Sequence, residues 1–180
     1  GINGTGKSTL LKIMAGLETP DEGQVIQASN LMIHYLPQNP EFSEEDTVLQ
    51  SVQNMVHHHA NENELIAAKA MLTRLGITDF EQKTRELSGG QRKRLALVSV
   101  LITPCDVLIL DEPTNHLDSE MADWLENKLQ AFRGALVMVT HDRYFLDSVT
   151  NKIIELDKGK IYSYDEKYSG FLQRKAEREE

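Results

Sequence analysis

The sequence is poor in cysteine, in long apolar runs and in net positive charge. Cys105 is its single cysteine, which excludes a disulfide within the chain and fits a reducing cytoplasm. A membrane-spanning helix needs roughly 20 consecutive apolar residues, and no run approaches that length. Lys and Arg total 19 against 28 Asp and Glu, so the net charge is −9. Bulk electrostatics therefore do not favour nucleic acid, and a contact with RNA would need a local basic patch.

What remains is an ordinary globular composition in which strands and helices alternate. Of 180 residues, 40% are hydrophobic and 26% are charged, as in a soluble domain with a buried core. The pattern predicts an α/β fold, a mostly parallel sheet flanked by helices with a small helical subdomain at about 44–84. We expect strands at 24–27, 31–36, 107–110 and 136–139 (the last two buried), and a hairpin within 152–164. Helices are predicted at 7–16, after 46 or 47, at 64–75, from 88 to 102, after 118 or 119, and at 171–180.

A glycine-rich loop opens the chain. Residues 1–9 fit the pattern G-x-x-x-x-G-K-[ST] at every defined position. Its glycines let the backbone turn tightly, with N–H groups directed at anionic oxygens, and the helix that follows adds its positive end. Lys7 supplies a positive charge for the outer phosphates, and Ser8 offers a hydroxyl to Mg²⁺. The loop therefore predicts a site for a nucleoside triphosphate.

Two acidic residues follow the apolar strand predicted at 107–110. Asp111 at the end of this strand is placed to hold Mg²⁺ through water, opposite Ser8, as in the second half of a nucleoside triphosphatase site. Glu112 is then placed to orient or deprotonate the attacking water. Together with the phosphate loop, the pair predicts hydrolysis rather than binding alone.

A second anion site is predicted at Leu87-Ser88-Gly89-Gly90-Gln91. A Ser-Gly-Gly turn at the start of a helix offers bare N–H groups and a hydroxyl. One nucleotide does not need two such helix ends from one face of one domain. We therefore expect a shared nucleotide, held between the loop of one domain and the Ser-Gly-Gly end of another.

In their order and over nearly the whole chain, these motifs resemble the ATP-binding cassette (ABC) family of ATPases. Residues 1–9 match its Walker A loop, and residues 88–91 match its signature motif. Asp111 and Glu112 match Walker B and the catalytic glutamate. The resemblance implies ATP and Mg²⁺ as cofactors. It implies that nucleotide is contacted by Gly1, Asn3, Gly4, Thr5, Gly6, Lys7, Ser8, Thr9, Ser88, Gly89, Gly90, Gln91 and Asp118.

Three further roles come from this resemblance. Gln38 matches the Q-loop glutamine, which contacts Mg²⁺ and water and senses the γ-phosphate. His141 matches the switch histidine, and Asp118 matches the D-loop. The implied catalytic residues are Glu112, His141 and Gln38, and the implied metal ligands are Ser8, Gln38 and Asp111.

A narrower resemblance is to the ABC-F class, soluble proteins with two cassettes on one chain. It is carried by Glu112-Pro113-Thr114-Asn115-His116-Leu117-Asp118 and by 140–147. The charged tail is similar to the helix that links the two cassettes in that class. We therefore expect a cassette at 1–165, the start of the linker at 166–180, and a truncation before Walker A. The implied partners are a second cassette on the same chain and the ribosome with its rRNA, in the cytoplasm, without membrane insertion or disulfides.

The sequence departs from the family in two places. The strand and the adenine-stacking aromatic residue that the family places before Walker A are absent from the sequence. The stretch 38–87 is short for a class that often carries an arm there; His57-His58-His59 occupies this place and is interpreted as a solvated loop rather than a metal site. Arg92-Lys93-Arg94 is interpreted as a charged helix face.

Three other functions remain open from the sequence. The chain could be the ATPase subunit of a membrane transporter, because the same chemistry would serve. It could be a module that only binds nucleotide without hydrolysing it. The presence of both Glu112 and His141 argues against this function. A role in DNA repair is a third, and the net charge of −9 gives it no support.

Overall fold

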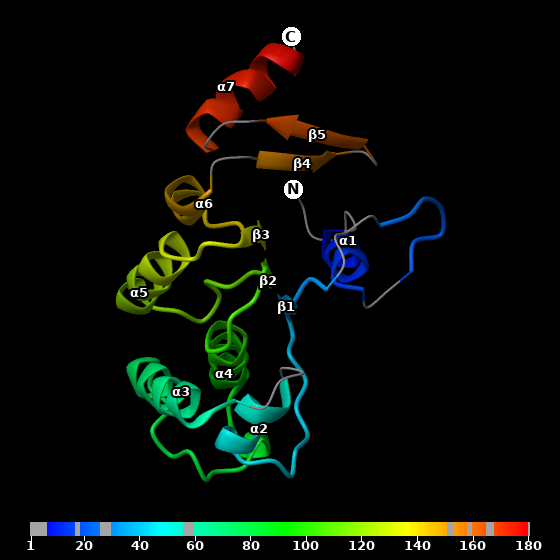
Figure 1. The fold of residues 1–180 in the computed structure, drawn as a ribbon. Coiled ribbons are helices and arrows are strands. Elements are labelled where there is room, and N and C mark those ends of the chain that lie inside the picture. The colour runs from blue at the N-terminus through cyan, green and yellow to red at the C-terminus, as the bar shows by residue number, and fades with distance from the viewer. Residues whose placement is uncertain are drawn as a thin grey trace.

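The computed structural model describes residues 7–16, 19–25, 30–55, 60–150, 153–157, 160–164 and 168–179. Its centre is a parallel sheet of three strands in the order β1-β2-β3 (Figure 1). These are β1 (Ile33–Leu36), β2 (Val107–Asp111) and β3 (Ala135–Val139). Leu36 pairs with Leu110, and Asp111 pairs with Val139, so the carboxyl ends of all three strands lie at one edge. The predicted α/β class with a parallel sheet is confirmed.

Helices cover the sheet on both sides. In Figure 1 the strands lie between α1 (Lys7–Met14) on one side and α5 (Ser119–Gln130) with α6 (Arg143–Val149) on the other. Asp118 caps α5 by accepting a hydrogen bond from the backbone N–H of Met121 at 2.8 Å. Asp142 caps α6 in the same way through Phe145, at 3.0 Å. A short polar residue thus begins each of these helices directly after a loop at the sheet edge.

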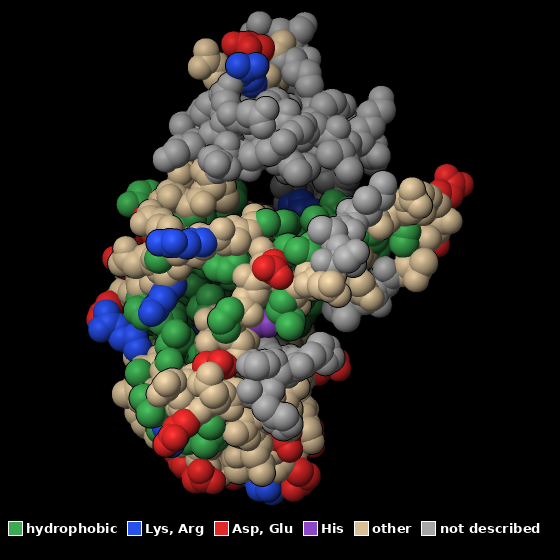
Figure 2. Space-filling view, viewed as in Figure 1, with side chains coloured by type: hydrophobic (Ala, Val, Ile, Leu, Met, Phe, Trp, Pro, Cys, Tyr) green, Lys and Arg blue, Asp and Glu red, His purple; other side chains and the backbone are tan. Residues whose placement is uncertain are grey.

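A helical lobe extends from the sheet and contains α2 (Val48–Met55), α3 (Glu62–Arg74), the 3₁₀ turn η1 (Thr84–Glu86) and α4 (Gly89–Leu101). α4 connects the lobe to the sheet, because it packs against α2 and α3 as well as β1 (Figure 1). Asn61 caps α3, and Gly76 follows the helix with φ of +81°, a conformation that glycine adopts without strain. Figure 2 shows acidic side chains distributed over this lobe on the face in view.

The last elements are an antiparallel hairpin and a helix. The hairpin pairs β4 (Ile153–Asp157) with β5 (Lys160–Tyr164), and α7 (Tyr168–Glu179) follows it. Both were predicted from the sequence. Within the part of the chain described here, no helix combines the length and the apolar character needed to cross a bilayer.

One continuous core joins the lobe to the sheet. It combines buried side chains of α2, α3 and α4 with those of β2, α5 and α6. Such burial is the main source of the folding free energy. The fully buried members include Leu36, Val48, Leu72, Leu95, Leu110, Leu125 and Phe145.

Two predicted strands differ from the structure. Gln24 and Val25 lie in irregular, exposed backbone, so the strand predicted at 24–27 is wrong for these two residues, and 26–27 lie outside the described residues. The strand predicted at 31–36 begins only at Ile33. β2 is buried along most of its length, as predicted, but β3 is only partly buried. Within the described sheet β3 is an edge strand, which leaves it less covered than its sequence suggested.

The single cysteine is a packing residue. Burial raises the pKa of the Cys105 thiol to about 11, the Asp106 charge adds to the rise, and a hydrogen bond with the His34 backbone opposes it. At pH 8 the thiolate fraction should then be roughly a hundredfold below that of an ordinary cysteine. We expect native Cys105 to react correspondingly slowly with a disulfide reagent, measured as the difference between the protein and its Cys105→Ser variant. Equal rates in the native and urea-unfolded protein would contradict this.

Candidate functional site

The three parallel strands deliver three loops to one edge of the sheet. Gln38 comes two residues after β1 ends, Glu112 directly follows β2, and His141 comes two residues after β3. The carboxyl ends of parallel strands are the usual ligand-binding edge of an open α/β sheet. Strand register therefore places Gln38, Glu112 and His141 along one edge, although they lie 29 or more positions apart in the sequence.

Glu112 has an unusual backbone at this edge. Its φ is +52°, in the left-handed region that a non-glycine residue adopts at some cost. Its N–H still donates to the carbonyl of Val139 at 2.7 Å, which continues the pairing of β2 with β3 by one more hydrogen bond. The residue is only 5% exposed. The turn therefore begins at Glu112 itself, and the side chain is held close to the loop after β3.

The Glu112 carboxylate contacts His141 in two places. Oε1 lies 3.2 Å from Nε2 of the imidazole, and Oε2 accepts from the His141 backbone N–H at 3.3 Å. The His141 side chain is 55% exposed, whereas that of Glu112 is 6% exposed. The pair thus combines a fixed, buried carboxylate with an imidazole that faces solvent. Such a pair can orient a water molecule and accept its proton.

Asp111 provides a carboxylate beside this pair. It is the last residue of β2, pairs with Val139 in register, and is 2% exposed. Among the described residues, no cluster of three His, Cys, Asp or Glu side chains could hold a metal ion. A single buried carboxylate, that of Asp111, fits Mg²⁺, which is usually bound through one or two carboxylates with the remaining positions left to water and phosphate.

The phosphate loop is described only in part. α1 begins at Lys7, which is half-buried, and the helix lies against β2. The backbone of Ser8 and Thr9 lies in the first turn of α1, but their side chains are not among the described parts. The other predicted loop residues, Gly1, Asn3, Gly4, Thr5 and Gly6, lie outside the described residues. A helix beginning at Lys7 beside β2 is compatible with the phosphate site predicted there.

Ser88 and Gln91 are bonded to each other at the start of α4. Ser88 Oγ accepts from the Gln91 N–H at 3.1 Å, and Gln91 Oε1 accepts from the Ser88 N–H at 2.9 Å, a capping box. The accepting Ser88 hydroxyl keeps its own O–H to donate to an anion. A Cβ built on Gly90 would lie 3.2 Å from Cβ of His116, so the signature turn and the loop before Asp118 are in close approach.

Sequence reasoning missed one buried residue of this site. Arg92-Lys93-Arg94 was interpreted as a charged face of the helix, but Lys93 is 3% exposed. Its Nζ donates to the carbonyl oxygens of Pro37 at 2.7 Å, Gln38 at 3.2 Å and Asp111 at 2.6 Å. Burial lowers the pKa of Lys93 to about 8, against the opposing effect of the Asp111 and Glu112 charges. The prediction is wrong for Lys93 because it considers the charges of the triplet and leaves out the position of each residue around the helix.

The helical period contains the signal that would have found Lys93. Positions 93, 96, 97 and 100 share one face of a helix, and Ala96, Leu97 and Val100 are buried on it. A single cation in the line of an apolar face indicates a buried, compensated charge rather than a solvated one. The structure thus connects Gln38 with Asp111 through Lys93, and Glu112 with His141 directly.

The chain is similar in sequence to several proteins of known class. Residues 1–115 match the family described as ABC transporter. The uncharacterized ABC transporter ATP-binding protein YfmR of Bacillus subtilis is 41% identical over 99% of this chain and 34% of its own length. The energy-dependent translational throttle protein EttA of Escherichia coli K12 is 36% identical over 99% of this chain and 39% of its own length. The chain thus spans between 34% and 39% of the length of these curated relatives.

Solved structures show the same fold. The complex of archaeal ribosomal stalk protein aP1 and archaeal ribosome recycling factor aABCE1 matches with a TM-score of 0.75 and 28% identity, over 97% of this chain and 35% of that one. A putative metal-chelate type ABC transporter in an inward-facing conformation matches with a TM-score of 0.67 and 26% identity, over 92% of this chain and 70% of that one.

Proposed function

Because the chain belongs to the ABC transporter family of ATP-binding domains, we propose that it binds Mg-ATP and hydrolyses it. The observation that best supports hydrolysis is the Glu112–His141 pair at the carboxyl edge of the sheet, beside the buried Asp111. A module that only clasps nucleotide has no need of a buried carboxylate held by an imidazole and a backbone N–H. The proposed residues are therefore those of an ATPase.

Residues at the start of α1 and at the ends of β1 and β2 would hold the phosphates and the metal. Lys7 and the N–H groups at the start of α1 neutralise phosphate charge, as helix N-termini and lysine do in other phosphate sites. The Ser8 hydroxyl, the Asp111 carboxylate and the Gln38 amide would hold Mg²⁺. When bound, Mg²⁺ would supply positive charge that offsets the negative charge developing on the phosphates.

Glu112 is proposed as the residue that orients the attacking water and accepts its proton. The two contacts from His141 fix the direction of its carboxylate, because one comes from the ring and the other from the backbone. His141, exposed on its outer side, would contact the γ-phosphate and so distinguish ATP from ADP. Ser88, Gly89, Gly90 and Gln91, with Asp118, would serve the nucleotide of a second, facing cassette.

We further propose that the cassette belongs to a protein of the ABC-F class that acts on the ribosome in the cytoplasm. This rests on its relatives: EttA is named a translational throttle protein, and aABCE1 a ribosome recycling factor. The length of those relatives leaves room for a second cassette on the same chain. A transporter neighbour shares the fold as well, at 26% identity, so the ATPase subunit of a transporter is the alternative function.

Co-sedimentation with ribosomes tests the ribosomal role. We expect the full-length protein carrying Glu112→Gln to pellet with ribosomes in the presence of ATP and to remain in the supernatant without nucleotide. The reason is that only the ATP-loaded, closed form presents both cassettes together. The same protein with ADP serves as a control. Absence from the ribosomal pellet under every nucleotide condition would count against the ribosomal role and favour the transporter alternative.

A further inference from the structure

Lys93 is a buried cation that none of the proposed roles uses. It lies on α4, five positions after Ser88, and is 3% exposed. An ammonium group has three N–H donors, and an unpaired one is costly to bury. Here the three donors meet three carbonyl oxygens, of Pro37, Gln38 and Asp111. A side chain needed only to fill this space could have been apolar.

The three acceptors come from two separate segments. Pro37 and Gln38 lie in the loop after β1, and Asp111 ends β2. Nζ lies 2.6 Å from the Asp111 carbonyl and 3.2 Å from that of Gln38. One atom of α4 therefore joins the backbone of Gln38 to the backbone of Asp111 directly beyond the last paired residues of β1 and β2.

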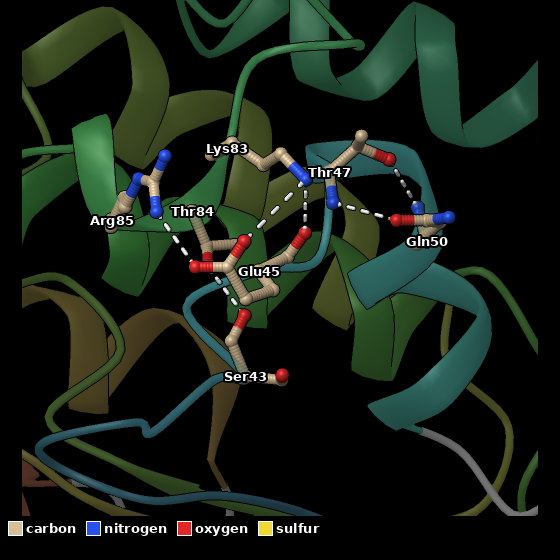
Figure 3. A network of polar contacts seen from close by, with 7 residues as sticks. All are labelled: Ser43, Glu45, Thr47, Gln50, Lys83, Thr84 and Arg85. Atoms are coloured by element: carbon tan, nitrogen blue, oxygen red, sulfur yellow. Dashed lines mark hydrogen bonds and ion pairs between the residues drawn. The ribbon is translucent and has the colours of Figure 1, made fainter.

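A second set of contacts holds the same loop farther along the chain. Figure 3 shows Glu45 between Lys83 and Arg85, with Arg85 Nη1 at 2.7 Å from Oε1 and Lys83 Nζ at 2.7 Å from the Glu45 carbonyl. The Thr84 hydroxyl, which is buried, donates to the Ser43 carbonyl at 2.8 Å. The segment from Pro37 to Thr47 is thus held near both ends by α4 and the turn that leads into it.

We propose that Lys93 is a positioning residue for ATP hydrolysis, holding Gln38 and Asp111 at the separation at which both reach one Mg²⁺ ion. The inference rests on the proposed function and deepens it, because it adds a residue that acts through two others. Since Ser88 begins the same helix, Lys93 also connects the end of α4 that faces the partner cassette with the metal site. A shift of α4 on closure would then change the Gln38–Asp111 separation.

A merely structural role makes a different prediction from a positioning role. Loss of packing lowers the fraction of folded protein and leaves the turnover of each folded site unchanged. Loss of position lowers kcat per nucleotide-binding site and raises the Mg²⁺ concentration needed for half-maximal binding of a fluorescent ATP analogue. Misplacement of a reacting group by about 1 Å can cost on the order of a hundredfold in rate.

The experiment compares Lys93→Met and Lys93→Gln in the full-length protein with Lys128→Met as the matched control. Lys128 is exposed on α5 and contacts the Trp124 ring instead of the site. Rates are expressed per site that binds a fluorescent ATP analogue, which removes unfolded protein from the comparison. We expect Lys93→Met to lower kcat at least about tenfold with little change in KM for ATP. Lys93→Gln keeps a shorter donor and should recover part of that loss.

A double-mutant cycle shows whether Lys93 acts through Gln38. Lys93→Met combined with Gln38→Ala should be hardly slower than Gln38→Ala alone, because the two changes affect one arrangement. Losses that simply multiply, or a kcat per site and Mg²⁺ dependence equal to those of Lys128→Met, would overturn the positioning role. A wild-type protein that neither binds nor hydrolyses ATP would instead overturn the proposed function, and this inference with it.

Discussion

Glu112→Gln is expected to lower ATP turnover by at least about a hundredfold, the usual range for loss of a general base, while ATP binding is retained. The amide keeps the size of the side chain but cannot take a proton from water. In the proposed arrangement of two cassettes around shared nucleotides, a site that cannot hydrolyse should hold the full-length protein closed with ATP bound. Phosphate release and retention of radiolabelled ATP on a filter measure the two effects.

Glu120→Gln is the matched control for this experiment. It makes the same chemical change and removes the same charge, but the Glu120 side chain is 78% exposed on α5. Its turnover should equal that of the wild-type protein. If the two variants hydrolyse ATP equally well, Glu112 has no role in activating water.

Phe145→Ala is expected to lower the free energy of unfolding by about 3–5 kcal/mol, the usual cost of removing a buried phenylalanine. Phe145 is 2% exposed and is the largest of the fully buried side chains in the described part of the chain. Its backbone N–H donates to the Asp142 side chain that caps α6, and alanine at this position keeps that hydrogen bond. Urea unfolding of the variant measures the loss.

Tyr144→Ala provides the comparison at the neighbouring position. Tyr144 lies in the same helix, is 76% exposed, and loses an aromatic ring of nearly equal size. Its effect on stability should stay within about 0.5 kcal/mol, as for most surface substitutions. Equal urea midpoints for the two variants would show that α6 does not pack as the structure places it.

The sheet edge could be predicted from sequence because short-range signals fix it. An apolar strand followed by Asp111-Glu112, and another followed by Thr140-His141, identify two carboxyl ends of a parallel sheet. Parallel pairing then places these ends together whatever the length of chain between them. The contact between Glu112 and His141 therefore follows from the pattern of strands, although its distance does not.

Other features depend on tertiary contacts that the local pattern does not contain. The charges around Lys93 favoured a solvated face, and only its carbonyl partners in two distant segments make burial possible. Val25 shows the opposite error: this β-branched residue was predicted to lie in a strand, and it is 46% exposed. Whether a side chain is covered is decided by neighbours far away in sequence.

At Glu112 the left-handed backbone lowers the stability of the fold, while the side chain is the one proposed to activate water. A residue other than glycine in this conformation costs on the order of 1–3 kcal/mol, which the folded chain carries permanently. Glycine would relieve that cost and abolish the carboxylate in the same substitution. Stability alone would thus favour glycine here, whereas the proposed catalytic role requires the glutamate.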